Sequence, residues 1–203
     1  MKEQNIGFLG GSFDPIHYGH IHLALELQER YQLDAVLFCP AFLSPAKQED
    51  PPQASAEERL AMVSLALEGL PQFSILDHEI KRQGISYTID TIRALIEESN
   101  LKQEKKKFHL LLGDDALENI LPWHEIEELF LLSPPLIGSR TGVIPTHLPP
   151  LMTEKVRKGF TRMPILDISS TLLRERLKKK LYCAHLMPAK VLDYIYENQL
   201  YYS

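Results

Sequence analysis

Glycines, hydroxyls and imidazoles gather in the stretch Gly10–His20, which reads Gly-Gly-Ser-Phe-Asp-Pro-Ile-His-Tyr-Gly-His. Gly10 and Gly11 let backbone amides approach a ligand closely, and the N-terminus of a following helix favours an anion. Because His17 and His20 are three residues apart, both side chains can lie on one face of the first helical turn. The stretch therefore predicts a phosphate site with two imidazoles directed at it.

The same stretch fits a phosphate better than a metal ion or a dinucleotide. Ser12 adds a hydroxyl donor to the loop, and Gly19 leaves room where a flat or bulky ligand could press. A metal site is disfavoured, because no carboxylate or cysteine joins His17, His20 and His22 at ligand spacing. A dinucleotide-binding fingerprint is excluded, because the spacing Gly-x-Gly-x-x-Gly is missing.

A second run of hydroxyl side chains lies far along the chain. It reads Ile168-Ser169-Ser170-Thr171-Leu172-Leu173-Arg174. Hydroxyls and amides at the start of a helix can hold a phosphate, and Arg174 can add a forked, charge-assisted contact. Ordinary capping of a helix explains the same hydroxyls without any ligand, and taken alone the run favours capping.

Short apolar runs alternate with helical periodicity in the first half of the chain. Strands are predicted at Ile6–Leu9, Ala35–Phe38, Phe73–Leu76 and Phe108–Leu112, and helices over residues 21–31, 60–67 and 89–96. Ser55 and Glu58 have the spacing of a capping box before the second helix. Strands that are apolar throughout predict an α/β fold with a Rossmann-like, doubly wound parallel sheet and helices on both faces. Ligands of such sheets bind at the carboxyl ends of the strands, where both motifs fall.

The second half of the chain gives weaker signals. Strands are predicted at Pro134–Gly138 and Ile165–Ile168, and helices at Ser170–Leu181 and Pro188–Tyr196, whereas residues 141–160 give no prediction. The length of 203 residues suits one domain, so we expect a single domain over residues 1–203 with a small C-terminal helical part at about 169–203.

The bulk composition excludes several function classes. Apolar residues make up 44% of the chain, which permits a sizeable core, and the formal net charge of −5 argues against a protein that coats nucleic acid. The basic clusters Lys105–Lys107 and Lys178–Lys180 are interpreted as solvated faces. Cys39 and Cys183 are far apart and suit a reducing compartment. No run approaches the roughly 18 apolar residues of a membrane helix, so we expect a cytoplasmic protein without a membrane partner. The sequence is compatible with a homo-oligomer.

Both motifs resemble signatures of the nucleotidylyltransferase superfamily. The stretch Gly10–His20 is similar to its Gly-Gly-Ser/Thr-Phe-Asp-Pro loop leading into His-x-Gly-His, and Ile168–Arg174 resembles its Ile-Ser-Ser-Thr-x-x-Arg element. A looser relative of His-x-Gly-His occurs in class I aminoacyl-tRNA synthetases, which share the underlying fold. Two signatures in the expected order are stronger than either alone.

Further segments resemble the bacterial nicotinate-mononucleotide adenylyltransferases in particular. These segments are the Pro-rich loop Pro40–Lys47, the Ser86-Tyr87-Thr88 element, Gly113-Asp114-Asp115 followed by Trp123, Arg140-Thr141-Gly142, and the tail with Pro188, Val191, Tyr194, Ile195, Leu200 and Tyr201. The chain departs from that family's usual pattern at Ala46, where His is frequent, at Thr141, where Pro is usual, and at His124, where Tyr is common.

The resemblance implies a role for each matched residue. Catalytic roles are implied for His17, His20, Lys47 and Arg174. ATP binding is implied for Gly10, Gly11, Ser12, Phe13, Gly113, Asp115, Ile168, Ser169, Ser170 and Thr171. Binding of the nicotinate nucleotide is implied for Ser86, Tyr87, Thr88, Trp123, His124 and Arg140. No protein side chain is expected to form a metal site, because Mg²⁺ arrives with ATP and is held mainly by phosphates and water.

The reaction implied joins ATP and nicotinate mononucleotide into nicotinate adenine dinucleotide and pyrophosphate, a step in NAD synthesis. The nearest alternative is the same chemistry on nicotinamide mononucleotide or phosphopantetheine. A non-catalytic nucleotide-sensing module on the same fold is more remote, because the expected phosphate donors are all present. A role like that of a tRNA synthetase is weaker still, because the chain is short and acidic overall.

Overall fold

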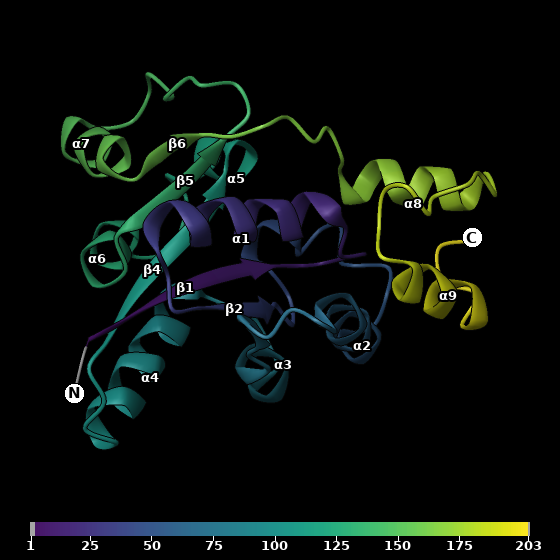
Figure 1. Ribbon diagram of the computed structural model, residues 1–203, viewed down its shortest axis with the longest axis horizontal. Coiled ribbons are helices and arrows are strands. Elements are labelled where there is room, and N and C mark those ends of the chain that lie inside the picture. The colour runs from purple at the N-terminus through teal and green to yellow at the C-terminus, as the bar shows by residue number, and fades with distance from the viewer. Residues whose placement is uncertain (1–2, 203) are drawn as a thin grey trace. The chain divides into compact units, whose positions relative to one another are not determined.

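A six-stranded sheet in the order β3-β2-β1-β4-β5-β6 organises the chain (Figure 1). The computed structural model describes residues 3–202. The strands are β1 (Gln4–Gly11), β2 (Ala35–Pro40), β3 (Phe73–Ile75), β4 (Lys106–Gly113), β5 (Pro135–Ser139) and β6 (Phe160–Arg162). The helices are α1 (Tyr18–Tyr31), α2 (Ala56–Leu67), α3 (His78–Arg82), α4 (Thr88–Leu101), α5 (Asp114–Glu118), α6 (Ile126–Leu132), α7 (Pro150–Lys158), α8 (Ser170–Lys178) and α9 (Ala189–Glu197), and η1 (Pro45–Lys47) is a 3-10 turn. The strand order is that of a doubly wound, Rossmann-like α/β fold, which confirms the predicted fold class.

Two compact units divide the chain. Among the described residues, unit 1 comprises residues 3–9, Leu23–Leu37 and Tyr87–Ile165. Unit 2 comprises Gly10–His22, Phe38–Ser86 and residues 166–202. The glycine loop, the Pro-rich loop and the second hydroxyl run therefore all belong to unit 2.

Parallel pairing of β1, β4, β5 and β6 forms the centre of unit 1. Phe8 pairs with Leu110 and both are buried, as expected for strands covered on both faces. Gly113 pairs with Gly138, so β4 and β5 end at the same edge of the sheet. A Cβ at Gly138 would lie 2.3 Å from a methyl of Leu23, so only glycine lets this helix residue pack against the strand.

In unit 2, α2 packs against β3 and against α9, which lies beside it in Figure 1. The predicted capping box at the start of α2 is confirmed. The Glu58 N–H donates to Ser55 Oγ at 3.2 Å, and the Ser55 N–H donates to Glu58 Oε2 at 2.7 Å. The C-terminal helical part consists of α8 and α9, close to the helices predicted there.

The prediction of a strand at Ile165–Ile168 is wrong. This segment has no strand pairing, and Ile165 is 66% exposed, so its apolar residues do not belong to the core. The strand in this region is instead β6, which pairs with β5 from Ile137 onward. Residues 141–160, which gave no prediction, contain α7, which begins at Pro150, a residue favoured at the first helical position.

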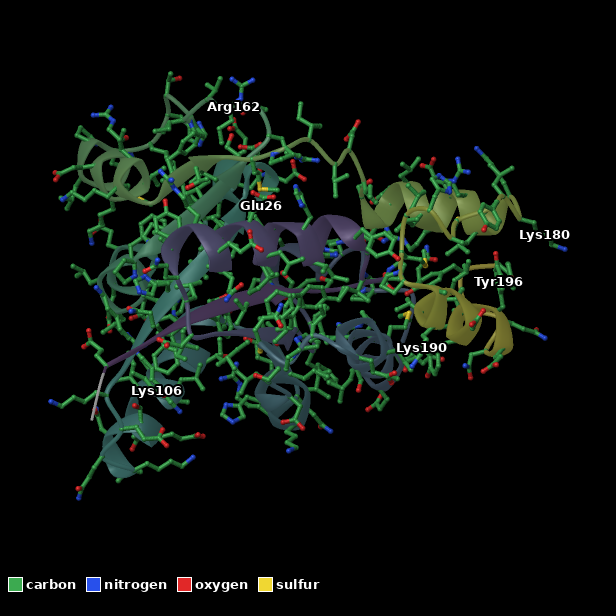
Figure 2. The ribbon with its side chains drawn as sticks, in the orientation of Figure 1. Glu26, Lys106, Arg162, Lys180, Lys190 and Tyr196 are labelled. Atoms are coloured by element: carbon green, nitrogen blue, oxygen red, sulfur yellow. The ribbon has the colours of Figure 1, made fainter. Side chains whose placement is uncertain are left out.

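The surface features expected from composition are present in the structure. The clusters Lys105–Lys107 and Lys178–Lys180 are largely exposed, and Lys180 extends away from the end of α8 in Figure 2. Cys39 and Cys183 are buried free thiols. Over residues 3–202, none of the helices is both long and apolar enough to cross a membrane.

Candidate active site

The glycine loop connects β1 to α1 through a residue with left-handed backbone. Phe13 has a φ of 49°, which is uncommon for a residue other than glycine. Its ring is buried and meets the His20 ring edge-on, with centroids 5.0 Å apart. Gly10 is exposed, and Gly11 and Ser12 are partly exposed. Phe13 is therefore an internal support of the loop, while the glycines keep backbone accessible.

His17 and His20 are stacked on each other with ring centroids 3.8 Å apart. The His17 N–H donates to His20 Nδ1 at 3.2 Å, and the Gly19 N–H donates to His17 Nδ1 at 3.1 Å. An Nδ1 that accepts a backbone N–H carries no proton, so each neutral ring must carry its proton on Nε2. Burial lowers the pKa of His20 to about 4, which keeps this imidazole neutral at pH 7. Each ring thus has an Nε2–H donor fixed by local backbone.

Gly19 makes room for the His17 ring, a constraint that the sequence did not predict. A Cβ at this position would lie 2.9 Å from both Cε1 and Nδ1 of His17. The space beside the Cα of Gly19 is therefore occupied by the His17 ring. Glycine at this position allows the His17 ring to lie against the first turn of α1 and to accept the Gly19 N–H.

The two signatures, far apart in sequence, are joined in unit 2. Ser170 Oγ donates to the Pro15 carbonyl at 2.9 Å, and Arg174 Nη1 donates to the Asp14 carbonyl at 2.7 Å. Ser169 caps α8, since its Oγ accepts the Leu172 N–H at 3.2 Å. The capping interpretation therefore holds for Ser169, whereas Ser170 and Arg174 contact the glycine loop. The remaining expected ligands of this run lie beside them, with Ile168 partly exposed and Thr171 exposed.

Arg59 is a supporting residue that the sequence analysis missed. Its side chain is 1% exposed, and among residues 3–202 its guanidinium donates only to backbone carbonyls. The acceptors are Ser12 O at 2.8 Å, Ala41 O at 2.5 Å, Phe42 O at 2.9 Å and Ala54 O at 3.3 Å. Arg59 thus ties the glycine loop to the loop after β2. A signal existed, because Arg59 shares a helix face with the apolar Met62, Val63 and Ala66.

The Pro-rich loop after β2 is supported by the Ser86 hydroxyl and contains the partly exposed cation Lys47. Ser86 is buried, and its Oγ accepts the Phe42 N–H at 3.0 Å, so its hydroxyl supports this loop. Lys47 lies in η1 and is partly exposed. Among residues 3–202, Lys47 Nζ has no hydrogen bond or ion pair, which leaves its charge available to an anion.

In unit 1, acidic and basic side chains meet where β4 and β5 end. Asp114 Oδ2 accepts the N–H groups of Arg140 at 2.7 Å and of Thr141 at 3.2 Å. Arg140 Nη2 lies 2.9 Å from Asp115 Oδ1, and the Asp115 side chain is 84% exposed. The structure therefore brings Gly113, Asp115 and Arg140 together. Asp114, for which the sequence predicted no role, fixes the loop after β5.

The expected ring-binding residues lie around the start of α4 and the loop before α6. The ring centroids of Tyr87 and His124 are 4.7 Å apart, and Trp123 is partly exposed. The backbone N–H of Trp123 donates to the Ile120 carbonyl at 3.0 Å, so Trp123 can contact a ligand through its side chain and not through this amide. Thr88 is the first residue of α4 and is partly exposed. The neighbouring Glu125 carboxylate is neutralised by Arg93, whose hydrogen bond holds the pKa of Glu125 below its usual value.

The side chains at these clusters are also informative about metal binding. Within the described part of the chain, residues 3–202, no group of three or more His, Cys, Asp or Glu side chains is placed to hold a metal ion. The donors gathered in unit 2 are instead imidazole Nε2–H groups, hydroxyls, backbone amides and the cations Lys47 and Arg174. Such a donor set suits a phosphorylated ligand that carries its own counter-ion.

Known proteins resemble this chain over almost its full length. Residues 8–176 match the model of the family described as cytidylyltransferase-like. A protein of Oceanobacillus iheyensis named "Probable nicotinate-nucleotide adenylyltransferase" is 36% identical over 202 residues, covering 99% of this chain and 97% of that protein. A protein of the same name from Dehalococcoides mccartyi strain CBDB1 is 39% identical over 208 residues, covering 99% of this chain and 98% of that protein.

Solved structures share the fold. The Plasmodium falciparum nicotinic acid mononucleotide adenylyltransferase complexed with APC matches with a TM-score of 0.77 and 22% identity, covering 98% of each chain. The same enzyme complexed with NaAD matches with a TM-score of 0.74 and 22% identity, again over 98% of each chain.

Proposed function

Because the chain belongs to the nicotinate-nucleotide adenylyltransferase family, we propose that it transfers the adenylyl group of ATP to nicotinate mononucleotide. The products are nicotinate adenine dinucleotide and pyrophosphate. The observation that carries the proposal is that the glycine loop and the Ile168–Arg174 run are hydrogen-bonded to each other in unit 2. Ser170 donates to the Pro15 carbonyl and Arg174 donates to the Asp14 carbonyl. A chain that only needed a capped helix would not require these two contacts to the glycine loop.

The chemistry requires charge stabilisation rather than a strong base. The attacking phosphate oxygen of the mononucleotide is already ionised at neutral pH, so no general base is needed. Negative charge must instead be accommodated as pyrophosphate leaves, which calls for fixed donors. His20 and His17 supply Nε2–H groups held by local backbone, and Arg174 supplies a guanidinium. ATP enters with Mg²⁺, which neutralises part of the phosphate charge.

The unit 1 residues are proposed to recognise the nucleotides. The rings of Tyr87 and His124, with Trp123, offer flat surfaces suited to the pyridine ring of the acceptor. Asp115 offers a carboxylate that can accept from ribose hydroxyls, and Arg140 beside it offers a cation for a carboxylate or phosphate. The buried, free thiols Cys39 and Cys183 fit our proposal that the enzyme works in the reducing cytoplasm.

We expect the acid mononucleotide to be used in preference to the amide. Each donor or acceptor left without a partner in a dry pocket costs roughly 1–3 kcal/mol, which corresponds to about 5- to 150-fold in kcat/KM. The measurement is kcat/KM for nicotinate mononucleotide, nicotinamide mononucleotide and phosphopantetheine, each with ATP and with pyrophosphate release as the readout. Equal use of acid and amide, or preference for another acceptor, would contradict the acceptor assignment, and no turnover with any of the three would favour a non-catalytic module.

Replacing Lys47 with alanine should weaken the handling of ATP phosphates without unfolding the protein. Its ammonium is uncommitted in the described structure, and a charge-assisted contact is worth about 1.5–3 kcal/mol, so kcat/KM for ATP should fall by about tenfold or more. The matched control is Lys190→Ala, which removes an exposed lysine of unit 2 that pairs with Glu68 and should change kcat/KM by less than about twofold. Equal kinetics for the Lys47→Ala variant and the parent would identify Lys47 as a solvated loop lysine.

A further inference from the structure

A buried tyrosine from the segment after α9 reaches the glycine loop. Tyr201 is 6% exposed, and its hydroxyl donates to Asp14 Oδ1 at 2.7 Å. Burial, and then the negative charge of Asp14, raise the pKa of Tyr201, so the phenol keeps its proton and stays a donor. None of the sequence signatures assigned a task to this hydroxyl.

The backbone of Tyr201 is held in an unfavourable conformation. Its φ is 66°, in the left-handed region that a bulky residue rarely adopts. Such a conformation costs on the order of 1–3 kcal/mol and persists where surrounding contacts determine it. The hydrogen bond to Asp14 is one of the contacts that hold the side chain in this place.

Asp14 links Tyr201 to the second signature. Its carboxylate accepts the N–H groups of Gln53 at 2.9 Å and Ala54 at 3.1 Å, in addition to the Tyr201 hydroxyl. Its carbonyl accepts from Arg174 Nη1 at 2.7 Å, and the same nitrogen lies 3.7 Å from Asp14 Oδ2. Arg174 is therefore oriented by a residue whose own side chain is fixed partly by Tyr201.

We propose that Tyr201 is a positioning residue that acts through Asp14 to hold Arg174 in place for adenylyl transfer. The proposal rests on the proposed function and adds a residue that does not itself touch the substrates. Without the phenolic hydroxyl, the Asp14 carboxylate keeps its two backbone donors but loses the shortest of its three hydrogen bonds, the one that Tyr201 makes to Oδ1 at 2.7 Å. A displacement of about 1 Å at a group that acts on a transition state can lower turnover by about 10²-fold.

The Tyr201→Phe variant tests this with the loss of a single hydroxyl. We expect kcat to fall by about tenfold at a temperature where the variant is fully folded, which lies within the range that misplacement can produce. The matched control is Tyr202→Phe, because Tyr202 is exposed and its ring stacks on that of Tyr196, with ring centroids 6.5 Å apart. Tyr196 of α9 is labelled in Figure 2. That control should keep kcat within about twofold of the parent.

A double-variant cycle separates positioning from simple stability. If Tyr201 acts through Arg174, the combined Tyr201→Phe and Arg174→Lys variant should turn over about as slowly as Arg174→Lys alone. Multiplying effects, or a Tyr201→Phe variant with a lowered Tm and a kcat within twofold of the parent, would overturn the positioning role and leave the proposed function intact. An inactive parent, in contrast, would overturn both.

Discussion

Replacing His20 with alanine should lower kcat by about 10²- to 10³-fold, which is the usual cost of removing one hydrogen-bond donor to a charge that develops in the transition state. Most of the affinity for ATP should remain. In the structure His20 Nδ1 accepts the His17 N–H, so its Nε2–H is the group left for a phosphate oxygen. If the imidazole only supported packing, its loss would lower Tm and leave turnover of the folded enzyme unchanged. We expect His17→Ala to behave similarly, because its Nδ1 is also occupied by backbone.

Two amide substitutions at position 20 sharpen this prediction. His20→Asn retains an acceptor near the position of Nδ1 and lacks the Nε2–H, so it should keep the turn intact and be about as slow as His20→Ala. His20→Gln can place an amide N–H near the position of Nε2 and should recover part of the turnover. Steady-state kcat and Tm for all three variants would decide. Turnover of His20→Ala within a few-fold of the parent would show that the loop only binds.

The pH dependence gives a further check on His20. Its pKa is lowered to about 4 by burial, so it remains neutral throughout the neutral range and gains a proton only near that value. The kcat profile of the parent should therefore contain no change from His20 titration between roughly pH 6 and pH 8. A donor that worked as an imidazolium would instead lose activity as the pH rises through an ordinary histidine pKa.

Replacing Arg59 with methionine should lower the free energy of unfolding by roughly 3–5 kcal/mol, a large part of the stability of a typical domain. The guanidinium fills hydrogen-bonding sites on the carbonyls of Ser12, Ala41 and Phe42. Methionine can fill much of the volume but offers no donor, and each buried carbonyl left without a partner costs roughly 1–3 kcal/mol.

The matched control for Arg59 is Arg176 on α8. Arg176 Nη2 donates to one carbonyl, that of Tyr182 at 2.8 Å, and its Nε has no partner in the described part of the chain. Arg176→Met should therefore cost only about 1 kcal/mol. Urea denaturation of both variants beside the parent makes the comparison. A loss below about 1 kcal/mol for Arg59→Met would mean that the loop carbonyls find other partners.

Much of this fold could be predicted from the sequence, because the patterns that specify its strands and helix starts lie within short segments of the chain. Continuous apolar runs closed by glycine predicted β1 and β4, and Ser55 with Glu58 predicted the start of α2. The failure at Ile165–Ile168 shows the limit of such signals, because an apolar run and a buried strand look alike until tertiary burial is known.

The parts of the candidate site that consist of local sequence motifs could be predicted from the sequence. The parts that depend on contacts between residues far apart in the chain could not. The glycine loop and Ile168–Arg174 could be recognised from residue types in order. The contacts of Arg59 with Ser12 and of Tyr201 with Asp14 join residues separated by 47 and 187 positions, so no local pattern could place them. The purpose of Gly19 also depended on where the His17 ring lies.

The most direct measurement of the central claim follows the α-phosphorus of ATP. The purified enzyme would be incubated with nicotinate mononucleotide, Mg²⁺ and ATP labelled at its α-phosphorus, and the products separated by chromatography. We predict label in nicotinate adenine dinucleotide, unlabelled pyrophosphate in equal amount, and formation of both that is about 10²- to 10³-fold slower with His20→Asn. Label recovered in free AMP or unreacted ATP, with no labelled dinucleotide, would contradict adenylyl transfer to this acceptor.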